Sequence, residues 1–310
     1  MFEKIYGNEL QKKIISSMIE KDRLVHSIIL TGDKGLGKFT FAKEIAKQVA
    51  YANNLNKNIQ NCVDINIIDG NLCGSIVINN IRDIKSKINI APHEGIKKIQ
   101  IIANCEKMTV AAQNAILKSL EEPSQSTIFI LTTSNICKLL STIKSRAIVI
   151  NMSELSEPEA IKILSSRASI NQISKIALFV KIFGGNIGLV ESLLNNISED
   201  SDLIKNCENF LFSIAYGNRY KIMDILSQYQ NSTSLSSFLE IFKIYFEKIL
   251  KTHLTKKNLD DLLINHSSEN FSFLEKYIYI SDLINKTIKY IEFNVNFNLL
   301  VTWLNSNLIK

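Results

Sequence analysis

The sequence lacks paired cysteines, a membrane-length apolar run and an export signal. Its five cysteines are scattered and no two form a C-x-x-C pair, so neither a disulfide framework nor a cysteine zinc cage is indicated. No apolar stretch approaches the roughly 20 residues that span a bilayer, and the N-terminus lacks the basic-then-apolar layout of an export signal. These absences argue against a membrane protein or a disulfide scaffold. We expect a cytoplasmic protein.

What is present suits a soluble chain of several domains. The 310 residues are 46% hydrophobic, enough to bury a sizeable core spread over two or three domains. The net charge of +6 is compatible with a position near nucleic acid, but a genome biased toward lysine and asparagine would produce the same excess. Charge therefore does not decide the function.

The most informative stretch is 27–49, where a short apolar run leads through a glycine-rich turn into a helical pattern. Gly32, Gly37 and Lys38 have the P-loop spacing G-x-x-x-x-G-K-[ST], with Gly35 between them. In such a loop, backbone amides and the helix N-terminus surround a polyphosphate and the lysine reaches its outer phosphates. A glycine-rich turn without a ligand is the alternative interpretation.

One position departs from the P-loop pattern. Phe39 stands where a Ser or Thr hydroxyl should hold magnesium, and Thr40 cannot simply replace it, because one residue along a helix rotates the side chain by about 100°. The loop therefore predicts nucleotide-binding architecture without its metal chemistry. The amides, Lys38 and the Thr40 hydroxyl could still hold ATP or ADP phosphates without hydrolysis.

Apolar strands alternate with helical patterns up to residue 151. Helices are predicted at 41–49, 76–88 and 109–120, the last capped by Thr109 and stopped by Pro123. Strands are predicted at 27–31, 63–68, 98–102, 127–132 and 147–150. This alternation favours an α/β domain with a parallel sheet covered on both faces.

The chain becomes helical after residue 151. Two or three short helices are predicted at 158–194, broken at Gly184, and a long apolar stripe at 235–249 predicts a helix packed against others. A polar stretch at 195–202 is the best candidate linker. We therefore predict an α/β P-loop domain (1–151), a small helical domain (152–200) and an all-α domain (201–310).

The end of the third predicted strand lacks the carboxylates of a P-loop ATPase. An aspartate there should support magnesium and a glutamate should prepare the attacking water, but the residues are Ala103 and Asn104. Glu106 is close in sequence, but it is expected to face a different direction. Together with Phe39, these three losses predict a site that does not hydrolyse ATP.

Three segments carry a resemblance to a known family: KMTVAAQNAILKSLEEP at 107–123, TIFILTTSN at 127–135 and LLSTIKSRA at 139–147. They resemble the AAA+ subunits of the bacterial clamp loader, and most closely the delta-prime type of DNA polymerase III. The resemblance is strong from Ile5 to about Ile150, weaker through the next helices and mainly one of helical pattern after 201, although 294–300 is also similar. It implies a P-loop domain, a lid and a helical collar that joins five subunits into a ring, which opens a sliding clamp and places it on primed DNA.

The resemblance assigns roles to individual residues. It implies that Arg146, in Ser-Arg-Ala where the family has Ser-Arg-Cys, acts in trans as an arginine finger on the neighbouring subunit's nucleotide. A surface arginine is the alternative. Thr133 and Asn135 match the sensor region, where local hydrogen bonding is the expected role without hydrolysis. The lid's sensor arginine falls at Gly188 and is missing.

Two further family features remain. Many members bind zinc through four cysteines between the first helix and the second strand, where only Cys62 occurs here, since Cys73 lies too far along; we predict no zinc and no metal site. Gln113 and Asn114 could act at a subunit contact or toward DNA, although polar residues on a helix surface are usually just solvated.

Three functions follow. The first is a non-hydrolysing delta-prime-like subunit that needs no cofactor, works with gamma/tau and delta subunits, the sliding clamp and primer-template DNA, and has no membrane partner. The second is an active gamma/tau-like loader ATPase. The third is an independent P-loop enzyme, such as a small-molecule kinase. Phe39, Ala103 and Asn104 argue against the second and third.

Overall fold

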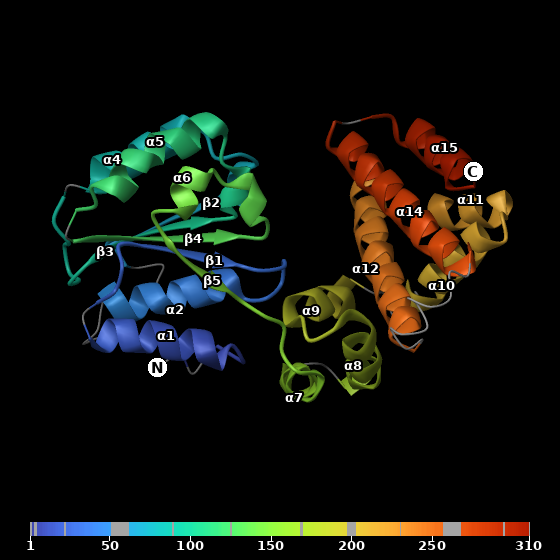
Figure 1. Ribbon diagram of the computed structural model, residues 1–310, viewed down its shortest axis with the longest axis horizontal. Helices are drawn as coiled ribbons and strands as arrows, with labels where there is room; N and C mark the ends of the chain where they lie inside the picture. Colours follow the sequence, from blue (N-terminus) through green and yellow to red (C-terminus); the bar gives the residue numbers. More distant parts are fainter. Residues whose placement is uncertain are drawn as a thin grey trace. The chain divides into compact units, whose positions relative to one another are not determined.

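The computed structural model describes residues 2, 5–21, 23–50, 62–88, 90–124, 126–167, 170–196, 203–229, 231–256, 268–293 and 295–309. The described residues divide into two compact units. The first comprises 1–180 and 184–192, and the second comprises 181–183 and 193–310. The colours of Figure 1 follow the chain through both.

The first unit contains the predicted parallel sheet. Its strands are β1 (Ser27–Thr31), β2 (Ile65–Asp69), β3 (Lys98–Ala103), β4 (Thr127–Thr133) and β5 (Ile148–Asn151). They lie in the order β2-β3-β4-β1-β5, and every neighbouring pair is parallel. The central strands β1, β3 and β4 are buried along their whole length, which explains why they read as continuous apolar runs.

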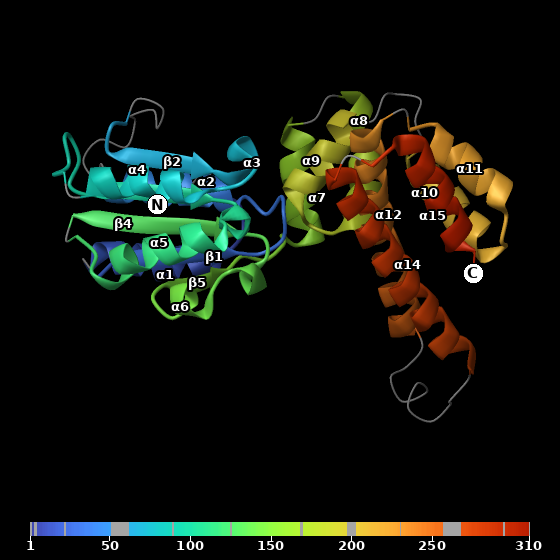
Figure 2. The same cartoon turned by 90° about the horizontal axis from the view of Figure 1, so that it is seen from above.

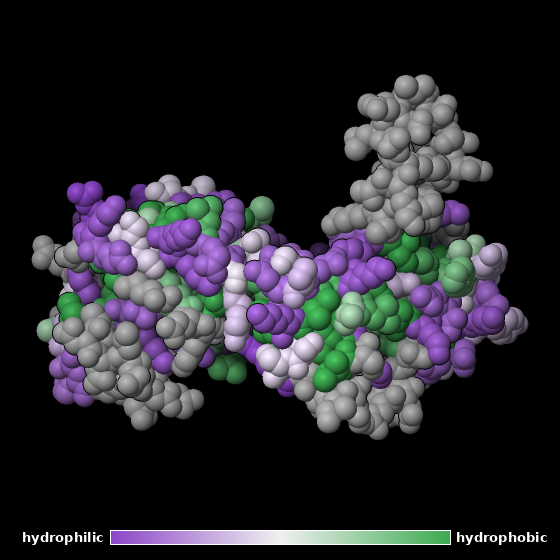
Figure 3. Space-filling view, turned by 90° about the horizontal axis from the view of Figure 1, so that it is seen from below, coloured by the Kyte–Doolittle hydropathy of each residue, from purple (hydrophilic) through white to green (hydrophobic). Residues whose placement is uncertain are grey.

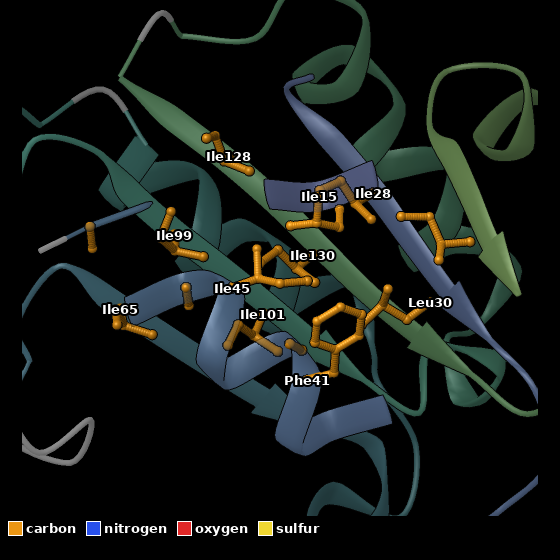
Figure 4. Close-up of a cluster of buried hydrophobic side chains, with 14 of the residues drawn as sticks. Ile15, Ile28, Leu30, Phe41, Ile45, Ile65, Ile99, Ile101, Ile128 and Ile130 are labelled. Carbon is orange, nitrogen blue, oxygen red and sulfur yellow. The ribbon is translucent and has the colours of Figure 1, made fainter. Parts of the chain in front are cut away.

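Helices cover both faces of this sheet (Figure 1). One face carries α1 (Glu9–Glu20) and α2 (Lys38–Ala50), and the other carries α4 (Ile78–Ile88), α5 (Val110–Glu121) and α6 (Ser141–Lys144). Side chains alternate along each strand, so Ile28 and Leu30 pack toward α2 while Ile29 packs toward α5. Figure 4 shows the first cluster, in which Phe41 and Ile45 of α2 meet the strand isoleucines.

Short helical turns connect the main elements at the C-terminal edge of the sheet. These are α3 (Gly70–Cys73), η2 (Cys105–Lys107) and η3 (Ile136–Lys138). The predicted cap of α5 is confirmed, because Thr109 Oγ1 accepts a hydrogen bond from the Ala112 amide at 3.2 Å. The helix ends at Glu121, just before Pro123. The predicted second strand is shifted by two residues at its start, since 63–64 form a turn before β2.

Three lid helices follow β5: α7 (Glu157–Arg167), α8 (Ile170–Phe183) and α9 (Ile187–Asn196). The predicted break is confirmed, since α8 ends at Phe183 and Gly184 has a left-handed φ of 78°. In the first unit, α9 lies at the P-loop end of the sheet, where its N-terminal backbone contacts the loop.

The second unit is helical, as predicted. It comprises α10 (Leu203–Ala215), α11 (Arg219–Ser227), α12 (Ser232–Lys256), α14 (Ser268–Glu292) and α15 (Phe297–Leu308). The long helices α12 and α14 lie side by side (Figures 1 and 2). The predicted stripe forms the core, where Phe238 and Phe242 of α12 pack on Phe210 of α10 at centroid distances of 5.4 and 4.8 Å.

The proposed division at 151 and 200 stays a prediction, because most of the lid groups with the sheet in one compact unit. The predicted loop at 51–60 lies outside the described residues, as do most of the linker at 195–202 and Asn294 of the 294–300 segment. Among the described helices, none combines the length and apolar character needed to cross a membrane. Exposed apolar side chains occur in both units, and Figure 3 shows some of them in green among hydrophilic residues.

Candidate functional site

The P-loop joins β1 to α2 at the C-terminal edge of the sheet. Gly32, Gly35 and Gly37 all have positive φ values, of 143°, 89° and 77°, a conformation that side-chain-bearing residues rarely adopt. A Cβ at Gly37 would meet nothing within 4 Å, so the glycine is required there for backbone shape and not for lack of space. The loop has the cradle geometry that the sequence predicted.

Lys38 is the first residue of α2, and it is only 7% exposed. Its Nζ donates hydrogen bonds to the carbonyl oxygens of Gly32 at 2.7 Å and Asp33 at 2.6 Å. Burial lowers the pKa of Lys38, while the negative charges of Glu106 and Asp33 oppose that shift. The ammonium group therefore binds the backbone of its own loop. Phosphate oxygens of a ligand would compete with these two carbonyls for the hydrogen bonds of Lys38.

Phe39 and Thr40 point to different environments. Phe39 packs against the apolar cluster on the sheet, and Lys43 Nζ lies 4.0 Å from its ring centroid. Thr40 is exposed and lines a cavity of about 210 Å³ together with Gly35 and Gly37. The hydroxyl thus belongs to the cavity wall, as a phosphate contact would require, and no oxygen replaces the one missing at Phe39.

The N-terminal segment and the lid also line the cavity. Tyr6, Leu155 and Ile187 of α9 are among the lining residues. Arg167 Nη1 pairs with Glu191 Oε1 at 2.8 Å, and the guanidinium lies 5.2 Å from the Tyr6 ring centroid. The volume and mixed apolar and polar lining would suit a nucleotide base.

The lid is bonded directly to the P-loop backbone. Asn186 Nδ2 donates to the Lys34 carbonyl at 2.7 Å, and the Gly188 amide donates to the Gly35 carbonyl at 3.1 Å. Asn186 is only 4% exposed. Sequence reasoning missed this contact, since nothing near 186 resembles a known motif.

Gly188, the position of the missing sensor arginine, touches Gly35. A Cβ built on Gly188 would lie 2.6 Å from the Gly35 carbonyl oxygen and 2.7 Å from its Cα. No side chain fits at 188 while the lid keeps this contact.

The end of β3 offers no carboxylate to a metal. Ala103 is completely buried, and Asn104, in a left-handed conformation with φ 52°, donates from Nδ2 to Asp69 Oδ1 at 2.7 Å. The amide is thus used to connect neighbouring strand ends. Positions 103 and 104 therefore give no carboxylate to a magnesium ion, which prefers such oxygen ligands.

The expectation that Glu106 faces away from the site was wrong. Its carboxylate accepts hydrogen bonds from Ser134 Oγ at 2.5 Å and from the Ser134 amide at 3.3 Å, and its charge acts on Lys38. The left-handed turn at Asn104 and the short helix η2 redirect the chain toward the end of β4.

Glu106 is held as a carboxylate at this edge. Burial raises the pKa of Glu106, but hydrogen bonds from Ser134 and Thr133 outweigh burial, and the net shift is downward. Its Oε2 is buried and has no hydrogen-bond partner among the described residues. A charged, partly unsatisfied carboxylate therefore lies at the edge of the sheet that carries the P-loop lysine, and its charge acts on that lysine.

The sensor residues make local contacts. Thr133 ends β4 directly opposite Thr31, the last residue before the P-loop. Its Oγ1 accepts from the Asn135 amide at 3.0 Å, and Asn135 Oδ1 accepts from the Cys137 amide at 3.0 Å. The local hydrogen bonding expected of both residues is confirmed.

Arg146 lies at the surface between α6 and β5. Its Nη2 pairs with Glu121 Oε1 at 2.7 Å, and its Nη1 donates to the Thr142 carbonyl at 2.9 Å. The Arg146 side chain is 34% exposed, and its own carbonyl accepts from Ser27 Oγ at 2.7 Å. The guanidinium is therefore accessible, while the backbone beneath it is fixed to β1.

Gln113 is not a solvated surface residue. It is 3% exposed, its Nε2 donates to the carbonyls of Met108 and Lys138 at 3.3 and 3.1 Å, and its Oε1 accepts from the Leu140 amide at 2.8 Å. It ties α5 to the segment that leads to Arg146. Asn114, the next residue, is exposed.

No group of three or more His, Cys, Asp or Glu side chains that could hold a metal occurs in the parts of the chain that the structure describes. Cys62 is buried and Cys73 is exposed. Residues 51–61 of the interval in which the family's zinc would lie are outside those parts, so the absence of zinc stays a prediction.

Taken together, the parallel sheet, the glycine-rich loop after its first strand and the helices that follow define an α/β domain of the P-loop type. Comparison with known proteins narrows this class. Residues 7–156 match the family model described as "DNA polymerase III, delta subunit". This segment is similar to clamp-loader subunits of DNA polymerase III, both of the delta' and of the gamma/tau type.

Similar proteins include both types of subunit. DNA polymerase III subunit gamma/tau of Mycoplasma genitalium is 25% identical over 96% of this chain and 54% of its own length. Subunit delta' of Bacillus subtilis is 28% identical over 71% of this chain and 66% of its own. This chain thus spans about half the length of the gamma/tau relative.

A solved gamma subunit-related protein from Thermotoga maritima covers 94% of this chain and 97% of its own, with 19% identity and a TM-score of 0.45.

Proposed function

We propose that this chain is a non-hydrolysing, delta-prime-like subunit of the DNA polymerase III clamp loader. In this role it helps to load the sliding clamp onto primed DNA, in a complex with gamma/tau and delta subunits. Its catalytic contribution is Arg146, donated to the nucleotide of a neighbouring ATPase subunit. It requires no cofactor and no zinc, and its own P-loop holds ATP or ADP without turnover.

The observation that carries this proposal is the donor set at the P-loop edge. Phe39 packs into the core, Ala103 is buried, and the amide of Asn104 is bonded to Asp69. Metal and base provide most of the charge stabilisation in phosphoryl transfer. A cradle that keeps Lys38 but lacks the expected hydroxyl at 39 and the expected carboxylates at 103 and 104 supports binding without hydrolysis.

The surroundings of Arg146 support its donation. Its pair with Glu121 is partly exposed, with 34% and 45% of the two side chains accessible. Such a pair is worth at most about 1 kcal/mol, whereas an arginine finger is worth on the order of 10³ to 10⁵ in rate. A neighbour's phosphates could therefore take the guanidinium from Glu121 at little cost.

The purified protein should show no magnesium-dependent ATP turnover. Phosphate release would be measured at saturating ATP with MgCl₂, and a Lys38→Ala variant serves as the control for contaminating ATPases. A rate equal to that of the control is expected. A faster rate that is lost in Lys38→Ala would contradict the proposal.

An active gamma/tau-like ATPase is the second candidate. It is favoured by the gamma/tau and tau relatives, which are 25 to 30% identical to this chain, because the delta' relatives, at 28 and 29%, are no more similar. It is also favoured by Glu106, which places a carboxylate near Lys38. The same ATPase measurement separates the two candidates.

A further inference from the structure

We propose that this P-loop prefers nucleoside diphosphates to triphosphates, because the Glu106 carboxylate occupies the end of the site where a third phosphate would lie. This inference rests on the proposed non-hydrolysing P-loop and specifies its ligand. Glu106 would act as a residue that selects phosphate number.

The strand register places the two charged groups at neighbouring strand ends. Thr31, which precedes the P-loop, lies opposite Thr133, which precedes Ser134. Lys38 Nζ is bonded to the loop carbonyls that directly follow Thr31, and the Glu106 carboxylate is bonded to Ser134. Because adjacent strands are roughly 4.8 Å apart, the ammonium and the carboxylate lie beside neighbouring strand ends at the same edge of the sheet.

The Glu106 charge is incompletely compensated. Its hydrogen bonds to Ser134 and Thr133 favour the ionised form, while Oε2 is buried without a hydrogen-bond partner among the described residues. The Lys38 ammonium donates hydrogen bonds to the loop carbonyls of Gly32 and Asp33.

A third phosphate would meet this carboxylate without the usual counter-charges. In a P-loop ATPase, magnesium and arginine residues neutralise the terminal phosphate. Here Phe39 and Ala103 provide no metal ligand, and Gly188 provides no lid arginine. The loop amides and Lys38 can serve two phosphates, whereas the third adds repulsion from Glu106 in a partly buried site where charges are weakly screened.

The experiment is calorimetric titration of the full-length protein with ADP and with the non-hydrolysable triphosphate AMP-PNP, in EDTA and in MgCl₂. We expect ADP to bind about tenfold more tightly than AMP-PNP, corresponding to about 1.4 kcal/mol. Glu106→Gln, which keeps the side-chain shape but removes the charge, should largely abolish that ratio. Glu20→Gln, at an exposed position at the end of α1, is the matched control and should preserve it.

Each outcome has a defined meaning. Equal affinities in the wild type or tighter AMP-PNP binding would overturn this inference and leave the proposed function intact. No binding of either nucleotide would overturn both this inference and the proposed occupancy of the P-loop by nucleotide, while the proposed role of Arg146 would stand. A wild-type preference for ADP that persists in Glu106→Gln, with the variant's thermal unfolding unchanged, would show that another group selects the ligand and would also overturn it. Turnover of ATP would instead refute the non-hydrolysing role.

Discussion

At position 188, the lack of a side chain is a packing requirement as well as a chemical loss. A Cβ there would overlap the backbone of Gly35, so the lid can rest on the P-loop only with glycine at this place. Asn186, two residues earlier, strengthens the contact by donating a hydrogen bond to the adjacent carbonyl of Lys34. The chain thus has a backbone contact at the position where the resemblance predicts an arginine.

Asp64 is another residue whose role comes entirely from its surroundings. It is 1% exposed, and its carboxylate accepts hydrogen bonds from the amides of His93, Glu94 and Gly95 at 2.7, 2.8 and 2.7 Å. Burial raises the pKa of Asp64, but these amides and the charge of Lys98 outweigh it, and the net shift is downward. The carboxylate anchors the loop before β3.

Asp64→Asn should destabilise the protein by about 3 kcal/mol at neutral pH, since hydrogen bonds to a buried charge are worth roughly 1.5 to 3 kcal/mol each and the amide keeps some of them. Because the folded-state pKa is depressed, the stabilisation is present above the unfolded-state pKa and is lost as pH falls through the folded value. The difference between wild type and variant should therefore shrink below about pH 4.

Urea unfolding between pH 3 and pH 7 measures this difference. Asp83→Asn, at an exposed position on α4, is the control and should change the free energy of unfolding by less than about 0.5 kcal/mol. A gap between Asp64→Asn and wild type that stays constant across the whole range would show that the carboxylate charge is not responsible.

At the scale of elements, helix α10 shows how one helix serves both core and surface. Phe210 is fully buried between Phe238 and Phe242 of α12, whereas Phe212 on the same helix is 59% exposed. The rotation of about 200° between residues two apart in a helix explains the contrast. The two phenylalanine side chains are therefore expected to contribute different amounts to the free energy of unfolding.

Phe210→Ala should cost about 3 to 5 kcal/mol of stability, because it removes a large side chain from a packed core and leaves a cavity. Phe212→Ala, its matched control, should change stability by less than about 1 kcal/mol. Urea unfolding followed by circular dichroism gives both values. Similar losses for the two variants would mean that Phe212 is also part of the core in solution.

Helix α5 connects the site to the arginine. Gln113 bonds to the backbone before the helix and to the segment at 138–140, while Glu121 at its last turn pairs with Arg146. One helix thus positions both ends of the stretch that carries the proposed finger.

At the scale of the whole molecule, the proposed function lies in an assembly. Arg146→Ala should leave the isolated chain folded, since the pair it removes is worth at most about 1 kcal/mol. In a reconstituted loader, it should lower turnover on the order of 10³ at the site it serves, so that only the other sites remain active.

The measurement is steady-state ATPase activity of the reconstituted complex, together with thermal unfolding of the isolated variant. Lys144→Ala, a basic residue two positions earlier, is the control and should retain the wild-type rate. An unchanged rate for Arg146→Ala in a correctly assembled complex would rule out the finger.

Periodicity and motif spacing were sufficient for the α/β domain, the P-loop and the helical remainder. Buried parallel strands have no polar face and so read as apolar runs, the loop glycines must adopt positive φ, and the stripe at 235–249 repeats at helical steps. The sequence also predicted that Phe39 and Ala103 provide no metal ligand, because folding cannot give a side chain an oxygen atom that it lacks.

Only the tertiary structure decided three features of the site. These are the orientation of Glu106, the burial of Gln113 and the backbone contact between the lid and Gly35. Each depends on where the chain turns after a strand or helix ends, as at the left-handed Asn104, and on partners that are distant in sequence. Such contacts have no local period or spacing. The sequence by itself therefore determined which groups this site contains and which it lacks, and the fold decided which of them face one another.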